Sequence, residues 1–347
     1  MPSASMVQAP SPSVSATVSA VPDVGVLLPD GFGRWSALAR ALRTDLDRVG
    51  IRHTMILVPS GASAMTQGVQ SLADAGVGQL VIAGMADGST VEAISLAKRL
   101  GMRIVEIGRL TPSSGVDAAV VANPEDRGRM LGNGLVRCLS GNGVVAGPVM
   151  LINGPEESDE ARLERARSVE VIRAAGYSIA DEAWMADPSA TEASDVFRPM
   201  YADANGDLVG VIAMSDHAAE GVISVLNGNA QAGKVSVAGM GASPQTLQQL
   251  IGGSQCVTVI PSVQEESRVG VELIHNLLAG ERDAQANPSR PGVNDLATDT
   301  AIPVAVVDST AIYVTGVPEL IAQGWASPAE VCATDELKGA CAERGIR

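Results

Sequence analysis

Short apolar runs that alternate with amphipathic segments constrain the fold of this chain more than any other feature of its sequence. From Val24 on, runs such as VGVLL are followed by stretches in which apolar residues recur every three or four positions, as Leu38, Leu42 and Leu46 do. A continuous apolar run is typical of a strand buried on both faces, and the helices in between cover those faces. The pattern therefore predicts an α/β fold with parallel sheets, whose first strands lie at 24–28, 54–58, 80–84 and 103–108.

The same alternation begins again at AAVVA (118–122) and yields about ten strands in all, more than one open doubly wound sheet usually carries. We therefore predict two doubly wound parallel-sheet lobes joined by a three-segment hinge. Ligands bind at the carboxyl ends of the strands in such sheets, so the expected ligand cleft lies between the lobes. The hinge crossings are expected near 122–125, 258–262 and 291–302. The expected division is a flexible N-terminal tether at 1–22, lobe 1 at 23–122 plus 261–295, and lobe 2 at 123–260 plus 296–347.

Charge and hydropathy exclude two classes of partner. Lys and Arg number 24 against 39 Asp and Glu, a formal net charge of −15, which repels a phosphate backbone, so we expect no nucleic acid. Hydrophobic residues make up 46% of the chain, enough for a buried core. No apolar run is long enough to span a membrane. We expect a monomer.

The first 22 residues are rich in Ser, Ala, Pro and Val and carry no charge. They lack the basic start and the apolar block of a secretory leader. Their composition suits a flexible tether, such as the stalk that remains after removal of a leader or of a leader with its lipid-bearing cysteine. An extracytoplasmic location, with a lipid anchor as one form of attachment, is the corresponding expectation.

Four cysteines are present, and no two of them have the C-x-x-C spacing of a zinc or redox site. Cys332 and Cys341 lie close enough in sequence to close a small loop, and we predict a disulfide between them, which implies an oxidising compartment. The alternative is two unpaired thiols. Cys138 and Cys256 are interpreted as buried small hydrophobic residues.

The usual signatures of catalysis are missing. The sequence has no G-x-S-x-G elbow and no Walker loop, and VGVLLPDGFGRW stands where a G-x-G-x-x-G would follow the first strand. The three histidines, His53, His217 and His275, are scattered and form no metal-ligating pair. We therefore predict a protein that is not an enzyme and that uses no cofactor and no metal.

Polar or aromatic residues recur just after the predicted strands. Arginine forks and carboxylates bind hydroxyl groups, and tryptophan faces stack on the C–H surface of a sugar ring. At any single position, such as Asp87 or Ser215, a helix cap explains the residue equally well. As a set, these residues predict a binding site for a small molecule: Arg34, Trp35, Asp87, Arg109, Asn123, Asp159, Trp184, Asp216 and Met240.

Several blocks resemble type I periplasmic binding proteins, in particular the xylose-binding and related aldose-binding branch of bacterial sugar transport. They are VGVLLPDGFGRW, LVIAGMADGSTVEAISLAKRLGMRIVEIGRL, VGVIAMSDHAAEGVISVLNG and KVSVAGMGASPQTLQQLIGGSQCVTVI. The resemblance implies two lobes that close around one sugar and deliver it to the membrane permease of an ABC importer. It also implies sugar-contact positions at Arg34, Trp35, Arg109, Trp184 and Asp216.

The chain departs from that branch at positions that normally carry charge or an amide. Gly108 and Gly241 stand where the resemblance implies carboxylates, and Pro261 stands where it implies a lysine. Asp159 and Ser215 stand at positions of expected asparagines. The loss of charge-assisted hydrogen bonds changes which ligands a site can reject, so the ligand is either different, less hydroxylated or anionic, or no longer bound tightly.

Two further hypotheses stay open beside transport. The same two-lobed fold serves as the effector module of sugar-responsive repressors, although too few residues precede the first strand here for a DNA-binding domain. A ligand-sensing paralogue with altered or lost sugar binding is the other. A cleft that binds no sugar would favour the paralogue.

Overall fold

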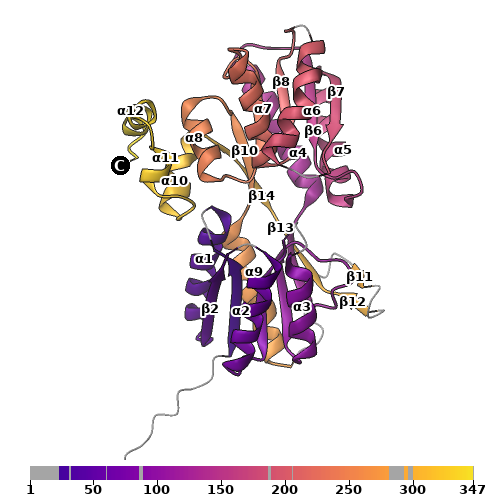
Figure 1. The fold of residues 1–347 in the computed structure, drawn as a ribbon, viewed down its shortest axis with the longest axis vertical. Coiled ribbons are helices and arrows are strands. Elements are labelled where there is room, and N and C mark those ends of the chain that lie inside the picture. Colours follow the sequence, from indigo (N-terminus) through magenta and orange to yellow (C-terminus); the bar gives the residue numbers. More distant parts are fainter. Residues whose placement is uncertain are drawn as a thin grey trace, which may run out of the picture.

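The computed structural model describes residues 23–30, 33–59, 61–85, 89–186, 189–204, 206–280, 293–295 and 300–346. It contains two six-stranded sheets, each at the centre of one lobe (Figure 1). This confirms the predicted α/β fold with two mostly parallel, doubly wound lobes. The predicted tether at 1–22 lies outside the described residues.

The first sheet has the order β13-β5-β4-β3-β1-β2 and is parallel throughout. Alternate residues of its strands enter different cores: Val26 and Leu28 pack with α1 and α9, whereas Leu27 packs with α2 and α3. Burial on both faces is the reason why these strands are apolar without interruption. The elements are β1 (Val24–Pro29), α1 (Arg34–Arg48), β2 (His53–Val58), α2 (Ala62–Asp74), β3 (Gln79–Ala83), α3 (Ser89–Arg99), β4 (Arg103–Gly108), β5 (Ala118–Ala122), α9 (Val263–Leu278) and β13 (Val304–Val307).

The second sheet has the order β14-β10-β9-β8-β6-β7, and only the pairing of β14 with β10 is antiparallel. Its two faces bury separate cores, one under α4 and α5 and the other under α6 and α7. The elements are α4 (Pro124–Gly141), β6 (Pro148–Asn153), α5 (Asp159–Ala174), β7 (Ser178–Trp184), α6 (Ala190–Asp203), β8 (Gly210–Ala213), α7 (Asp216–Gly228), β9 (Ser236–Met240), α8 (Pro244–Gly252), β10 (Val257–Pro261) and β14 (Ser309–Tyr313).

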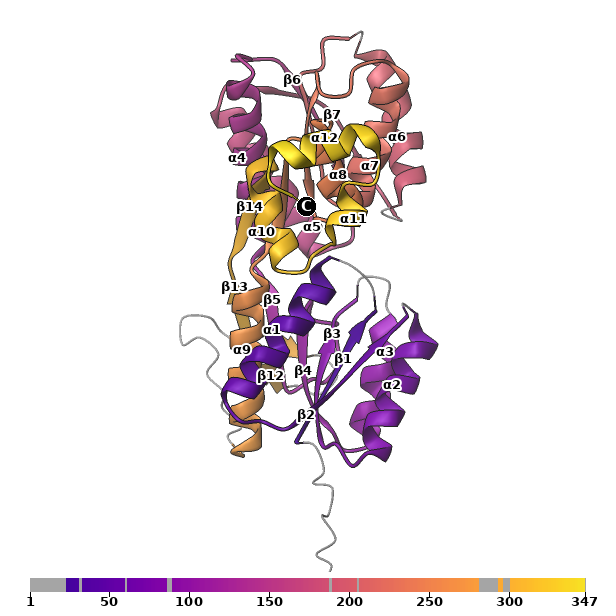
Figure 2. The same cartoon turned by 90° about the vertical axis from the view of Figure 1, so that its left-hand side faces the viewer.

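Two smaller parts complete the described chain. A two-stranded antiparallel ribbon pairs β11 (Val293–Asp295) with β12 (Thr300–Ile302). A C-terminal segment packs against α8, where Figure 2 shows it in yellow. It consists of η1 (Val314–Gly316), α10 (Val317–Ala322), α11 (Pro328–Val331) and α12 (Asp335–Glu343).

The chain passes between the two sheets at three places. It leaves β5 for α4 at Asn123, leaves β10 for α9 at Ser262, and leaves β13 for β14 at Asp308. The third crossing was expected at 291–302, and that expectation is wrong. Residues 304–307 pair in parallel with β5 and so complete the first sheet. The second stretch assigned to lobe 2 therefore begins after β13 and not at residue 296.

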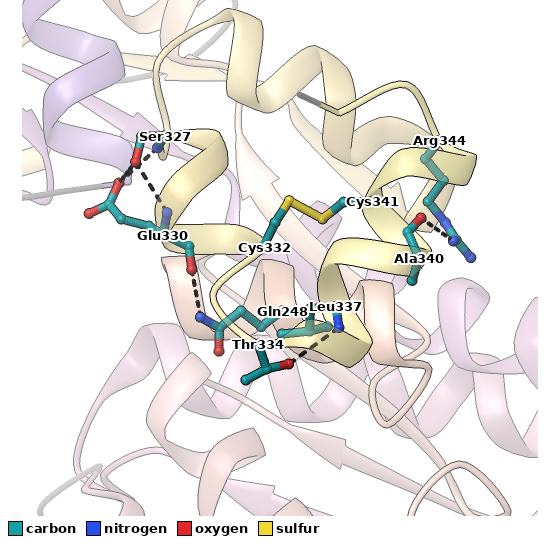
Figure 3. The surroundings of a disulfide bond; sticks show 9 residues. All are labelled: Gln248, Ser327, Glu330, Cys332, Thr334, Leu337, Ala340, Cys341 and Arg344. Atoms are coloured by element: carbon teal, nitrogen blue, oxygen red, sulfur yellow. Dashed lines mark hydrogen bonds between the residues drawn. A yellow bond between two sulfur atoms is a disulfide. The ribbon is translucent and has the colours of Figure 1, made fainter.

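Two disulfides are present among the described residues. The predicted bond between Cys332 and Cys341 is confirmed, and it links the end of α11 to α12 (Figure 3). The interpretation of Cys138 and Cys256 as unbonded core residues is wrong, because they form a disulfide across a sequence separation of 118. Helix α4 packs on β10 and brings Cys138 to the residue that precedes this strand. No short-range pattern in the sequence reveals that packing.

None of the described helices combines the length and the apolar character that crossing a membrane requires.

Removal of the disulfide between Cys138 and Cys256, which closes a long loop, should destabilise the protein more than removal of the one between Cys332 and Cys341. In the chain-entropy model, a loop of this length contributes about 5 kcal/mol and the loop between Cys332 and Cys341 about 3 kcal/mol. We expect the Cys138→Ala/Cys256→Ala protein to unfold at lower urea concentration than the Cys332→Ala/Cys341→Ala protein. The reverse order would show that native-state packing, and not chain entropy, decides the effect.

Candidate functional site

The carboxyl ends of the parallel strands of both sheets face the boundary between the lobes. The chain leaves the first sheet for the second lobe at the carboxyl ends of β5 and β13, and it returns from the carboxyl end of β10. Parallel neighbours share this direction, so side chains that follow the strands of either sheet gather at the same boundary. The sequence-predicted residues from both lobes lie at these strand ends, except Asp87, which is outside the described residues.

Arg34 is committed to an ion pair within the first lobe. Its Nη2 donates to Oε1 of Glu266 at 2.6 Å, and its guanidinium lies 4.6 Å from the ring centre of Trp35. The Glu266 side chain is wholly buried, whereas 22% of the Arg34 side chain is exposed. Partnering a buried charge avoids the large cost of leaving it alone. The pair therefore fixes the direction of Arg34 at the carboxyl end of β1.

Gly108 has its space taken by Arg34. This glycine has φ of +99°, and a Cβ atom built on it would lie 2.8 Å from Nη2 of Arg34. A side chain at this position would meet both backbone strain and a charged group. The Arg34 guanidinium thus occupies the space that a side chain at Gly108 would need.

Asp216 also has its hydrogen-bond partners inside its own lobe. It begins α7, and its carboxylate accepts hydrogen bonds from the backbone N–H groups of Ala242 at 3.2 Å and Ser243 at 2.6 Å. Burial raises the pKa of Asp216, and these hydrogen bonds oppose that change. Gly241 has φ of +142°, and a Cβ there would lie 2.5 Å from the Asp216 carboxylate. The acid of α7 therefore holds the turn that enters α8.

Two other polar candidates cap helices, and a third lies in the first turn of a helix. The Asn123 side chain accepts from the N–H of Glu125 at 3.1 Å and donates to Asp126 at 2.9 Å, which caps α4. Ser215 caps α7 by accepting from Ala218 at 3.0 Å. Asp159, in the first turn of α5, has a side chain that is 89% exposed and paired with Arg162. Asn123 and Ser215 thus satisfy orphan N–H groups at helix ends, whereas the N-cap of α5 is Ser158 and not Asp159.

Arg109 differs from the other charged candidates. It directly follows β4, it is half-buried, and no hydrogen bond or ion pair of its guanidinium occurs with the described part of the chain. Burial raises the pKa of Glu106 in the same lobe and the pKa of Glu164 on α5 in the other lobe. The positive charge of Arg109 opposes both shifts. Arg109 is thus a cation at the boundary whose hydrogen-bond donors are available to a ligand.

The turn that carries Arg109 rests on Glu106, a residue that the sequence analysis did not select. Glu106 is fully buried in β4, and its carboxylate accepts from the Thr111 N–H at 2.9 Å and from the Thr111 hydroxyl at 2.5 Å. Burial raises the pKa of Glu106 to about 7, against the lowering by Thr111 and Arg109. An acidic residue inside the apolar run RIVEIG is the signal that identifies it.

Glu266 was also missed. On α9 it follows the buried-face register of Val263, Gly270 and Ile274, where a charge is unexpected. A charged residue at an apolar position of an amphipathic helix signals a buried partner.

The remaining candidates are partly buried and apolar or aromatic. Trp35 packs on the core of the first lobe, Trp184 ends β7 opposite Asn153, and Met240 ends β9 against the core under α4. Among the described residues, no group of three or more His, Cys, Asp or Glu could hold a metal ion. Within the described ranges, these candidates comprise the Arg109 cation and two indole rings, and they include no nucleophile paired with a base.

The sequence and the fold of the chain are similar to those of binding proteins. Residues 29–282 match the family model described as periplasmic binding protein domain. The D-xylose-binding periplasmic protein of Escherichia coli K12 is 20% identical over 242 residues, 69% of this chain and 72% of that protein. A sugar ABC transporter sugar-binding protein from Bacillus halodurans has a TM-score of 0.67 at 14% identity, over 86% of this chain and 99% of that one. A periplasmic ribose ABC transporter protein from Conexibacter woesei has a TM-score of 0.65 at 14% identity, over 90% and 97%. At these identities the structures show a shared fold.

Replacement of Glu106 by Gln should flatten the pH dependence of stability. Because the pKa of Glu106 is raised from 4.5 to about 7, the folded state binds a proton that the unfolded state has released, and the free energy of unfolding falls as the pH rises through this window. The shift corresponds to about 3 kcal/mol. Urea unfolding at pH 5 and pH 8 should show this loss in the parent and not in Glu106→Gln.

The matched control for this comparison is Glu272→Gln, a substitution at an exposed glutamate on α9, which should keep the dependence of the parent. Equal pH dependence in the parent and in Glu106→Gln would contradict a buried proton at this site.

Gly108→Ala should cost more stability than Gly101→Ala. Both glycines have positive φ, so each substitution is strained by about 1–2 kcal/mol. A Cβ at Gly101 meets nothing within 4 Å, whereas one at Gly108 meets Arg34. In a double-mutant cycle with Arg34→Ala, urea unfolding should reveal a coupling on the order of 1 kcal/mol. Strict additivity would contradict the contact.

Proposed function

The chain belongs to the periplasmic binding protein domain family, and we propose that it closes on a small sugar or sugar-like ligand between its lobes and delivers it to an ABC importer. That family is one of binding proteins and not of enzymes. Solved structures of this fold include a protein from Agrobacterium radiobacter in complex with D-arabinose and one from Actinobacillus succinogenes with bound D-allose.

The observation that carries the proposal is the position of Arg109. Its guanidinium is held at the boundary by the turn built on Glu106 and has no hydrogen-bond partner among the described residues. An arginine in this state can donate two parallel hydrogen bonds to hydroxyl or carboxylate oxygens. Trp35 and Trp184 come from opposite lobes, and their rings can stack on the C–H faces of a sugar.

Closure of the lobes would then bury the ligand and form the surface that a membrane permease recognises. The three crossings at Asn123, Ser262 and Asp308 are short connections of the kind that absorb hinge rotation. Asp216 and Asn123 would act by positioning α8 and α4 and not by direct charge-assisted contact, since their side chains are engaged within lobe 2. Asp87 stays a proposed contact residue.

We propose an extracytoplasmic location for the chain. Two disulfides support an oxidising compartment. Residues 1–22 would serve as the tether to a cell surface, with or without a lipid. A monomer without a nucleic-acid partner agrees with the net charge of −15.

A sensor that has lost its ligand is the second candidate. It is favoured by one specific observation: Arg34 and Asp216, two charged groups at the boundary, already have charge or hydrogen-bond partners inside their own lobes. Such a protein would keep the two-lobed fold, because these ion pairs and hydrogen bonds stabilise the lobes themselves.

A thermal-shift screen against pentoses, hexoses, their acids and polyols tests the proposal. A ligand at a hundred times its dissociation constant adds about 2.7 kcal/mol of stability. Calorimetry on a hit should show that Arg109→Gln weakens binding about tenfold to a hundredfold through loss of charged hydrogen bonds. The control is Arg99→Ala, at an exposed arginine that ends α3. This variant should bind the ligand like the parent. A screen in which no compound raises the melting temperature would contradict the transport proposal and favour the ligandless sensor.

A further inference from the structure

The two lobes also touch outside the three crossings. Strand β1 is separated from β13, the crossing strand at the edge of the first sheet, by three other strands. Yet the backbone N–H of Gly33, which precedes α1, donates to the carbonyl oxygen of Trp325 at 2.5 Å. Figure 2 shows the C-terminal helices reaching the end of α1 on this side. The contact involves residues 324–326, which we call the C-terminal latch.

The latch is attached to the second lobe. The chain enters it from β14, and helices α10, α11 and α12 all contact α8. The Gln248 amide of α8 donates to the carbonyl oxygen of Glu330 at 2.7 Å, and the disulfide between Cys332 and Cys341 closes the segment that follows (Figure 3). These contacts make the latch a rigid projection of lobe 2 toward lobe 1.

The first lobe receives the latch with α1. Trp325 is fully buried in a single hydrophobic cluster that also holds Leu38 and Leu42 of α1 and Leu247 and Leu250 of α8. This cluster therefore contains residues of both lobes, and Trp325 is its largest fully buried side chain.

Next to Trp325, the Arg40 side chain of α1 lies close to the backbone of Gly324. Gly324 has φ of +85°, and a Cβ there would lie 2.3 Å from Cζ of Arg40, so the α1 arginine covers the latch backbone. Separation of the lobes at this point would expose the indole to water and break the bond from Gly33.

One feature of the contact makes it reversible. Nε1 of Trp325 is buried and has no hydrogen-bond partner among the residues that the structure describes. A buried N–H without an acceptor raises the free energy of the closed arrangement. Hydration of this group on opening offsets part of the loss of apolar burial.

We propose that the C-terminal latch holds the lobes together and that its release from α1 is the opening step. The latch acts on the equilibrium between open and closed forms in the absence of any ligand. Its consequence for transport rests on the proposed function: if the ligand binds the closed form, the apparent affinity is scaled by the fraction of closed molecules.

Pulsed electron paramagnetic resonance on the ligand-free full chain tests the latch directly. All four cysteines are in disulfides, so Gln70→Cys on α2 and Asp195→Cys on α6 would supply the thiols for two spin labels. Both positions are exposed and lie on elements away from the crossing strands. We expect one short distance population in the parent, and a major longer population when Trp325→Ala is added. An unchanged distribution in Trp325→Ala would overturn the proposal.

Two further variants keep this test decisive. Phe197→Leu truncates an equally buried aromatic residue in the core of lobe 2, away from the latch, and should leave the distances unchanged; the same lengthening there would overturn the proposal. Arg40→Ala removes an exposed side chain that covers Gly324, so it serves even if Trp325→Ala does not fold, and it should also increase the longer population. If Trp325→Ala cannot be prepared, an Arg40→Ala protein whose longer distance population does not increase would overturn the proposal. Because no ligand is used, failure here is distinguishable from a flat ligand screen.

Discussion

Each sheet of this protein is completed by a segment that the chain adds only after it has built most of the other sheet. Helix α9 covers the first sheet, yet it follows the last parallel strand of the second, and β13 then closes the edge of the first sheet beside β5. The apolar side chains of α9, such as Val271 and Ile274, are buried in the core beside α1. The chain therefore crosses back to the first sheet after β10, and it crosses once more to pair β14 with β10. Because the crossings leave β5, β10 and β13 at their carboxyl ends, these ends of both sheets face one another.

The charged groups at this boundary follow one physical rule. A charge next to a low-dielectric core must find a partner, and at two places on this boundary the partnered group occupies the volume in which the Cβ of a neighbouring residue would lie. Arg34 with Glu266 excludes a side chain at Gly108, and Asp216 with the N–H groups before α8 excludes one at Gly241. Glycine at both positions therefore has a local structural reason, and Arg109 is the charged candidate whose donors have no protein partner in the described chain.

The sequence predicted the elements well because their periodicity is a local property. The doubled α/β alternation, the helix cap considered for Ser215 and the disulfide between Cys332 and Cys341 all depend on residues close in the chain. The errors concern distant partners. Nothing near residue 304 says which sheet its strand joins, and the pairing of Cys138 with Cys256 depends on how α4 crosses β10. The identities of Arg34 and Asp216 pointed to a binding site, but only the fold shows that Glu266 and the turn before α8 engage them.

The disulfide between Cys138 and Cys256 has a mechanical consequence. It joins the first helix of the second lobe to the start of its last parallel strand, so residues 139–255 form a covalent ring around most of that lobe. A pulling force applied to the two ends of the chain runs through the sulfur–sulfur bond and bypasses the ring. The first lobe and the C-terminal segment would bear the load and extend, while the strands inside the ring stay shielded from it.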